Sequence, residues 1–246
     1  MRLLVVGNGR MGRLVVEHAP AYGFEVAAVL DRAANEGGAG ATAEGCRGVD
    51  VAVDFSTPET TLATAPRLAR LGVPLVVGTT GWQAREVELR AAVEEAGVGA
   101  VVAANFSLGA NVLDALAEAA GRLLRDAESY GAFVHEAHHA AKKDAPSGTA
   151  LMLRRALERG GYARAVDVSS TRAGWIPGTH TVGFDGKAET LELVHRVRDR
   201  ATFAHGALAA ARWVVGKRGW FGMEDVLSSR GAPFDSGGEG SAIAKR

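Results

Sequence analysis

The sequence has very little cysteine and no long hydrophobic run. Its one cysteine, Cys46, cannot form an intramolecular disulfide, which fits a reducing compartment. The apolar run near the N-terminus, around residues 3–6, is too short for a signal-peptide core or a membrane span. From the sequence alone we therefore expect a cytoplasmic protein with no membrane attachment.

The sequence also lacks an excess of charge of either sign. Lysine plus arginine and aspartate plus glutamate number 28 each, so no global positive field exists to hold nucleic acid or anionic lipid. We expect neither as a partner, and any anion binding must come from a local cluster. The length of 246 residues allows one large domain or two small ones, and the 32 glycines favour loops that let the backbone approach a ligand closely.

The first hundred residues alternate between short apolar runs and helical stretches. The continuous valine, leucine and alanine runs are typical of strands buried on both faces, as in a parallel sheet. Such an alternation predicts a Rossmann-like, doubly wound α/β domain. The expected strands are 3–6, 24–31, 49–56, the start of 74–81, and 99–107, and the expected helices are 10–21, 58–71 and 83–96.

The pattern changes after residue 107. Strand-like segments separated by Pro-Gly and Asp-Gly turns predict a smaller α+β domain with a mixed or antiparallel sheet. Its expected helices are 110–125 and 147–160, and its expected strands are 130–137, 165–173, 179–184 and 188–197. A last helix, 202–217, is expected to return to the first domain. We therefore predict a dinucleotide-binding domain from residues 1–107 and 205–246, a second domain at 108–204, and a mobile Gly/Ser-rich tail from about 229.

A glycine-rich turn separates the first predicted strand from the first predicted helix. In its G-x-G-x-x-G pattern Gly7 would make the tight turn, Gly9 would let backbone amides reach a pyrophosphate, and Gly12 would let the helix pack on the strand. Asp31 ends the second strand, where an acid takes the adenosine ribose hydroxyls, whereas Arg32 could instead meet a 2′-phosphate. Alternatively, these glycines only make a turn. The candidate cofactor residues here are Gly7, Asn8, Gly9, Arg10, Met11, Gly12, Asp31 and Arg32.

Two more turns lie at the carboxyl ends of predicted strands, where ligands bind in such sheets. Each alone is consistent with a plain loop, but together they favour contact with a cofactor or substrate. Their candidate residues are Gly78, Thr79 and Thr80 in the first turn, and Ala103, Ala104, Asn105 and Phe106 in the second.

The stretch EAHHAAKKDAPSGTA, residues 136–150, gathers four potentially cationic side chains just before a helix. His138 and His139 would point opposite ways on an extended segment, and no cysteine lies nearby, so we expect no metal. A bland solvated loop is a second possibility.

An anion site that also supplies a proton explains more of the pattern. Histidine titrates in the working range, and a lysine near other cations, such as Lys142, becomes a better proton donor near neutral pH. Ser147, Gly148 and Thr149 at the helix start offer backbone amides, a hydroxyl and the positive end of the helix dipole to a carboxylate. Beside a nicotinamide, a proton and a hydride make a reductase.

These motifs resemble the 4-hydroxy-tetrahydrodipicolinate (dihydrodipicolinate) reductase family of bacterial lysine and diaminopimelate synthesis. The resemblance reaches to about residue 227 and is most specific in E-x-H-H-x-x-K-x-D-A-P-S-G-T-A at 136–150. GRMG, GTTG, NFS, RAG, R-x-T-F-A and K-x-G-x-F-x-M-x-D-V-L, beginning at residues 9, 78, 105, 172, 200 and 217, also match.

The resemblance implies transfer of hydride from NADH or NADPH to a cyclic dicarboxylic imine, with loss of water. It implies that His138 is a proton donor or acceptor and Lys142 a proton donor. It further implies a homotetramer built through the sheet of the second domain. The implied substrate-binding residues are His139, Gly148 and Thr149. Ser147 is a further candidate from its place at the helix start, and Arg200 could add charge. The implied cofactor residues are those of the three turns together with Asp31 and Arg32.

The sequence departs from the family pattern at three places. Its glycine loop is one residue shorter than the commoner form, Ala140 and Ala141 replace basic residues, and Asp31 replaces a glutamate, which leaves the choice between NADH and NADPH open. Among rival classes, a short-chain dehydrogenase would need Y-x-x-x-K, which is absent. A dehydrogenase of the semialdehyde or glyceraldehyde-phosphate type would need a nucleophilic cysteine, but Cys46 lies in an early Gly-rich loop outside the second domain. Another two-domain amino-acid or imine reductase and a nucleotide-sensing regulator remain as alternatives.

Overall fold

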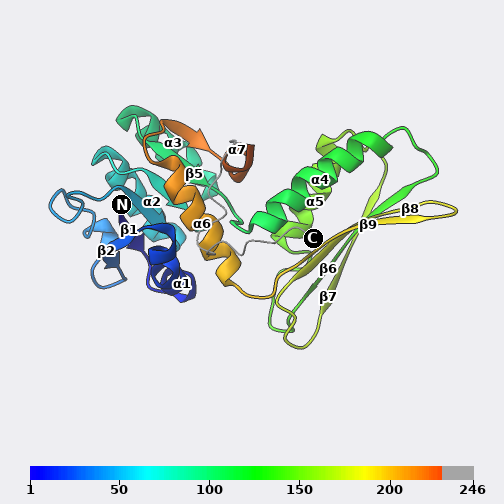
Figure 1. The fold of residues 1–246 in the computed structure, drawn as a ribbon, viewed down its shortest axis with the longest axis horizontal. Coiled ribbons are helices and arrows are strands. Elements are labelled where there is room, and N and C mark those ends of the chain that lie inside the picture. Colours follow the sequence, from blue (N-terminus) through cyan, green and yellow to red (C-terminus); the bar gives the residue numbers. More distant parts are fainter. Residues whose placement is uncertain (229–246) are drawn as a thin grey trace, which may run out of the picture. The chain divides into compact units, whose positions relative to one another are not determined.

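The computed structural model describes residues 1–228 (Figure 1), so the predicted mobile tail lies outside the described residues. The chain forms two units, each with its own core. The first unit contains Met1–Phe106 and the segment that begins at Phe203, and the second contains Ser107–Thr202. Among residues 1–228 no helix has the length and apolar character needed to cross a membrane.

The first unit is built on a six-stranded parallel sheet in the order β10-β5-β4-β3-β1-β2. Its strands are β1 (Arg2–Val6), β2 (Glu25–Leu30), β3 (Val51–Asp54), β4 (Leu75–Val77), β5 (Gly99–Val102) and β10 (Gly219–Phe221). Its helices are α1 (Arg10–His18), α2 (Pro58–Arg70), α3 (Glu86–Ala96), α6 (Ala201–Val214) and α7 (Met223–Ser228), with short 3-10 turns at Ala19–Tyr22, Glu36–Gly38 and Gln83–Arg85.

Helices cover both faces of this sheet, which confirms the doubly wound prediction. Val15 of α1 and Leu208 of α6 belong to the apolar core that also contains Val5, whereas Leu68 of α2 and Leu89 of α3 belong to the other core. Most buried residues of helix α6 are alanine or glycine, and these small side chains let the helix backbone lie close to the sheet. Strand β10 and helix α7 were not predicted, because a three-residue strand and a six-residue helix are too short to show a period.

The strand order places three loops side by side at the carboxyl edge of this sheet. Val6, the last residue of β1, lies opposite Leu30 of β2 and Asp54 of β3. Strand β1 is followed in sequence by β2 on one side of it, whereas β3 lies on its other side. Ligands of doubly wound sheets bind at such a reversal of strand order.

The second unit has a four-stranded sheet in the order β7-β6-β8-β9, and its mixed pairing confirms the prediction of a mixed or antiparallel sheet. Strand β6 pairs parallel to β7 and antiparallel to β8, and β8 pairs antiparallel to β9. Helices α4 and α5 pack on one face of the sheet (Figure 1). The bounds are α4 (Leu108–Leu124), β6 (Gly131–His138), α5 (Gly148–Arg159), β7 (Val166–Arg172), β8 (Thr179–Asp185) and β9 (Thr190–Arg196).

Candidate active site

The glycine-rich turn has the geometry of a phosphate-binding loop. Gly7 has φ +98°, and its N–H donates to the carbonyl oxygen of Leu30 at 2.8 Å. A Cβ at Gly12 would overlap the carbonyl oxygen of Gly7, whereas a Cβ at Gly9 would meet nothing within 4 Å. Gly7 and Gly12 therefore close the turn, and Gly9, the N-cap of α1, leaves open space at a helix N-terminus, where anions bind.

A cavity of about 1050 Å³ lies beside this turn and can accept a dinucleotide. Its lining includes Gly7, Asn8, Gly9, Asp31 and Arg32, together with loop residues that follow β3. Oδ1 of Asp31 accepts the N–H of Ala34 at 2.9 Å, which holds the Asp31 carboxylate in the loop after β2. Arg10 and Met11 belong to the first turn of α1 and do not line this cavity.

The two turns after β4 and β5 lie at the same sheet edge, but several of their side chains have structural tasks. The buried Thr79 hydroxyl donates to Oδ1 of Asp54 at 3.0 Å and accepts the N–H of Ser56 at 2.8 Å. Phe106 is 1% exposed and packs edge-on against Phe55 in the core. Thr79 and Phe106 can therefore meet a ligand mainly through their backbones. The cavity lining does not include Gly78, Thr80, Ala103, Ala104 or Asn105, so their cofactor role stays a prediction.

Two alanine substitutions should separate the tasks of the glycines. We expect Gly12→Ala to destabilise the protein by about 3 kcal/mol, the upper end of the usual cost of overpacking a core, because the new Cβ overlaps the backbone of Gly7. We expect Gly9→Ala to leave the melting temperature within about 2 °C of wild type but to weaken NADH and NADPH binding. Thermal melts and cofactor fluorescence titrations check both, and unchanged cofactor affinity in Gly9→Ala would contradict the role given to Gly9.

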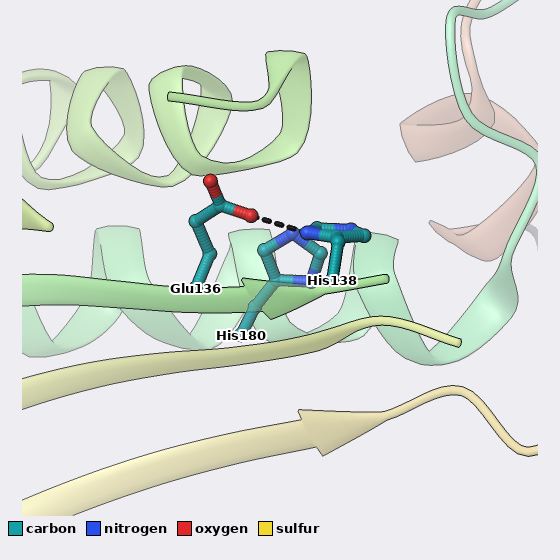
Figure 2. A group of neighbouring side chains, drawn as sticks. All are labelled: Glu136, His138 and His180. Carbon is teal, nitrogen blue, oxygen red and sulfur yellow. Dashed lines mark hydrogen bonds and ion pairs between the residues drawn. The ribbon is translucent and has the colours of Figure 1, made fainter. Parts of the chain in front are cut away.

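The second unit holds a buried carboxylate–imidazole pair. Glu136 and His138 are two residues apart on β6, so both face the helix-covered side of the sheet, where their exposed fractions are 0% and 8%. Nδ1 of His138 contacts Oε2 of Glu136 (Figure 2). Across the strands, His138 lies opposite Arg172 of β7, and Glu136 lies opposite His180 of β8. Nη2 of Arg172 donates to Oε1 of Glu136 at 2.6 Å.

The charges in this group follow from its burial and contacts. Burial would raise the pKa of Glu136, but the hydrogen bonds from Arg172 and Ser170 and the nearby His138 outweigh it and lower that pKa to about 2. Burial lowers the pKa of His138, although Glu136 acts in the opposite direction. Glu136 is thus ionised and His138 neutral at pH 7. Since a carboxylate only accepts hydrogen bonds, the His138 proton lies on Nδ1 and a lone pair remains on Nε2.

His180 is a site residue that the sequence analysis missed. Its ring packs edge-on against His138 with centroids 5.1 Å apart (Figure 2). Its Nε2 lies 3.2 Å from the Ser147 hydroxyl. Burial and the neighbouring His138 lower the pKa of His180 to about 4, so it is neutral at pH 7. Its place in β8 gave a usable signal, because alternation along that strand turns His180 toward the same face as Val182 and Phe184, which are fully buried.

Lys142 lies in the turn just after His138. Its N–H donates to the carbonyl oxygen of His139 at 3.1 Å, and its Nζ donates to both Asp144 carboxylate oxygens at 2.7 and 2.8 Å. The hydrogen bond from Lys142 lowers the pKa of Asp144, so the pair is an ion pair at neutral pH. Lys142 therefore has an acidic partner, which the sequence analysis did not foresee.

The start of α5 combines a closed and an open part. The Ser147 hydroxyl caps the helix by accepting the N–H of Ala150 at 3.2 Å, and the N–H of Ser147 donates to Glu136 at 3.3 Å. Ser147 is 2% exposed, so its polar groups serve the helix and the buried pair. Gly148 is exposed and a Cβ there would meet nothing within 4 Å, so the first turn of α5 at Gly148 and Thr149 is the part that can receive a carboxylate.

The substrate role of Arg200 and the expected absence of a metal both stay predictions. Arg200 is exposed, and in residues 1–228 no hydrogen bond or ion pair links it to the histidine-lysine segment, so its substrate role stays a prediction. Glu136, His138 and His180 offer ligand atoms within 4.8 Å of one another, a spacing that suits a metal ion. However, the Arg172 guanidinium already binds Glu136, and its positive charge opposes a second cation there. The expectation of no metal therefore also stays a prediction.

A Rossmann-like unit with a nucleotide cavity, joined to a unit with a buried base, a lysine and an open helix N-terminus, defines the class of two-domain dinucleotide-dependent reductases. Residues 1–106 match the family described as "Dihydrodipicolinate reductase, N-terminus", and residues 109–227 match "Dihydrodipicolinate reductase, C-terminus". The chain belongs to the dihydrodipicolinate reductase family, and the cofactor of its first unit is NADH or NADPH.

Individual relatives agree with this assignment. The 4-hydroxy-tetrahydrodipicolinate reductase of Thiobacillus denitrificans is 38% identical over 92% of this chain and 98% of that protein. The enzyme of the same name from Methanoregula boonei is 44% identical over 72% of this chain and 74% of that protein. The solved structure of dipicolinate-bound dihydrodipicolinate reductase from Paenisporosarcina sp. TG-14 shares the fold, with a TM-score of 0.76 at 21% identity over 92% of this chain and 100% of that one.

Proposed function

We propose that this protein reduces 4-hydroxy-tetrahydrodipicolinate to tetrahydrodipicolinate with NADH or NADPH, a step of lysine and diaminopimelate biosynthesis. The observation that carries the proposal is the family match over both units, in a chain that keeps the complete 136–150 signature. The substrate class fits the second unit, because a dicarboxylate finds cations and a helix N-terminus there. We place the protein in the cytoplasm, since this soluble substrate and the nicotinamide cofactors are found there.

The residues of the second unit divide the work of binding and proton transfer. The reduced nicotinamide, when bound, supplies the hydride. His138 accepts or returns a proton at Nε2, the ring nitrogen that Glu136 leaves open. Lys142 donates a proton from Nζ. A carboxylate of the substrate competes with Asp144 for the ion pair with the Lys142 ammonium group. Gly148, Thr149 and His139 bind a carboxylate of the substrate at the start of α5, next to the Ser147 cap.

Asp31 and Arg32 of the first unit are the candidate contacts for the adenosine ribose of the cofactor. Asp31 accepts hydrogen bonds from the 2′- and 3′-hydroxyls of NADH, and Arg32 pairs with the 2′-phosphate of NADPH. Both residues line the same cavity, which supports use of both cofactors.

We also propose a homotetramer that is built through the sheet of the second unit. Helices cover one face of this sheet and leave the other face open, where Val194 of β9 is 39% exposed. The other face carries a hydrogen bond between His135 of β6 and Ser169 of β7, at 2.9 Å, and several half-exposed side chains. A second copy of the sheet could pack on this face.

Oxidation of NADH and NADPH by the purified protein tests the function. A dihydrodipicolinate synthase would make the substrate in situ from pyruvate and aspartate semialdehyde. We expect oxidation that depends on the synthase, and the ratio of the two rates gives the cofactor preference. Absence of oxidation with either cofactor, despite measurable cofactor binding, would mean that the second unit acts on another substrate.

A further inference from the structure

We propose that Glu136, held by Arg172, is a positioning residue that fixes which nitrogen of His138 reacts. This inference rests on the proposed function, because it concerns the group to which that function gives the proton chemistry. Glu136 touches no open space and so acts through His138. Neither the family match nor the relatives assign it a role.

Every side-chain oxygen of Glu136 is committed. Oε1 accepts from Nη2 of Arg172 at 2.6 Å and from the N–H of Ser147 at 3.3 Å, while Oε2 faces Nδ1 of His138. The side chain is completely buried on the central pair of strands in its sheet. Such a carboxylate has one orientation, and it therefore gives His138 one orientation as well (Figure 2).

The groups around His138 set its protonation. Glu136 on β6 favours the imidazolium, whereas burial, Lys142 in the following turn and Arg172 on β7 disfavour it. His180 on β8, the remaining titratable neighbour, is neutral at pH 7. Glu136 is thus the one anion in this group that both raises the pKa of His138 and holds the proton on Nδ1. Without its charge, that pKa falls further and the tautomer with the proton on Nε2 becomes accessible.

Arg172 connects this pair to the segment that carries the lysine. Its Nη2 also donates to the carbonyl oxygen of Asp144 at 2.5 Å, and its Nη1 donates to that of Thr171 at 2.8 Å. Asp144 in turn binds Lys142. The Arg172 guanidinium therefore links Glu136, which orients His138, to Asp144, which binds Lys142.

Glu136→Gln in the full chain tests the proposal, because the amide keeps the shape and removes the charge. In the free protein, NMR titration of the His138 imidazole should move to lower pH by at least about one unit. With the coupled assay, kcat should fall on the order of 10- to 100-fold, the pH profile of kcat/KM should shift in the same direction, and the KM for NADH should not change.

A matched control is Glu118→Gln, an acid of the same unit that pairs with Arg159 at 3.0 Å on the surface. It should leave the titration of His138 and kcat at their wild-type values. If Glu136→Gln does not fold, the double variant Glu136→Gln/Arg172→Gln, which removes both buried charges, takes its place. Its His138 titration should move to lower pH by a smaller amount, because Arg172 itself disfavours the imidazolium, and kcat should fall as in the single variant.

A folded variant with an unmoved His138 titration and kcat within twofold of wild type would overturn the proposal. The titration needs neither substrate nor cofactor. A wild-type protein that shows no turnover would therefore reject the proposed function, while a shifted titration would still support the positioning role of Glu136.

Discussion

His138→Gln should lower kcat by about 10²- to 10⁴-fold, the usual contribution of a positioned general acid–base group. Glutamine can still hydrogen bond to Glu136, but it has no titratable nitrogen to accept or return a proton. The affinity for NADH should stay within about twofold of wild type, because His138 belongs to the second unit and the nucleotide cavity to the first. Coupled oxidation and fluorescence titration measure the two quantities.

A matched control is His18→Gln, in the last turn of α1, where the ring packs against His205 with centroids 4.5 Å apart. This change should leave kcat near wild type, since His18 belongs to no proposed site. A kcat in His138→Gln within threefold of wild type would remove His138 from the mechanism.

Arg172→Met should destabilise the protein by about 3–5 kcal/mol at pH 7, the usual cost of removing one partner of a buried ion pair. The change leaves the ionised, fully buried Glu136 without its closest cation. Urea unfolding followed by circular dichroism gives the free energy of unfolding. The control is Arg159→Met, whose ion pairs with Asp114 and Glu118 are half exposed, so its cost should be about 1 kcal/mol or less.

The same variant carries a pH signature. In the wild type the pKa of Glu136 is lowered to about 2, so its contribution to stability is complete above the unfolded value near 4.5 and is lost as the pH falls from there toward 2. Without Arg172, that pKa rises and the contribution is absent. The difference in stability between wild type and Arg172→Met should therefore shrink as the pH falls below about 4.5. A difference that does not depend on pH would contradict the pairing of Arg172 with Glu136.

The sequence predicted the fold because its local signals agreed with one another. Continuous apolar strands, the helical stretches between them and the glycine turn all indicated a doubly wound sheet, and the Pro-Gly and Asp-Gly turns separated the strands of the second sheet. Strand β10 was missed because Gly-Trp-Phe at 219–221 carries no period, and only pairing with β5, far away in the sequence, makes it a strand.

The site was predicted only where its residues are close in sequence. His138, Lys142 and the start of α5 lie within one short segment, so their spacing suggested an anion site with proton chemistry. Arg172 and His180 reach His138 through the register of β7 and β8, which one sequence does not specify. The hydrogen bonds of the buried Thr79 and Ser147 could not be predicted either, because their partners Asp54, Glu136 and His180 lie on strands elsewhere in the sequence.

The chain leaves the first unit after Phe106 and returns to it at Phe203, and this interruption determines the order in which the protein can fold during synthesis. One core of the first unit contains Val5 and Val15 but also Leu208 and Val214, which are made about two hundred residues later. The second unit is continuous and has its own core. On the ribosome the unit in the middle of the sequence can therefore finish first, and the apolar sheet face that will receive α6 stays exposed until α6 has been synthesised.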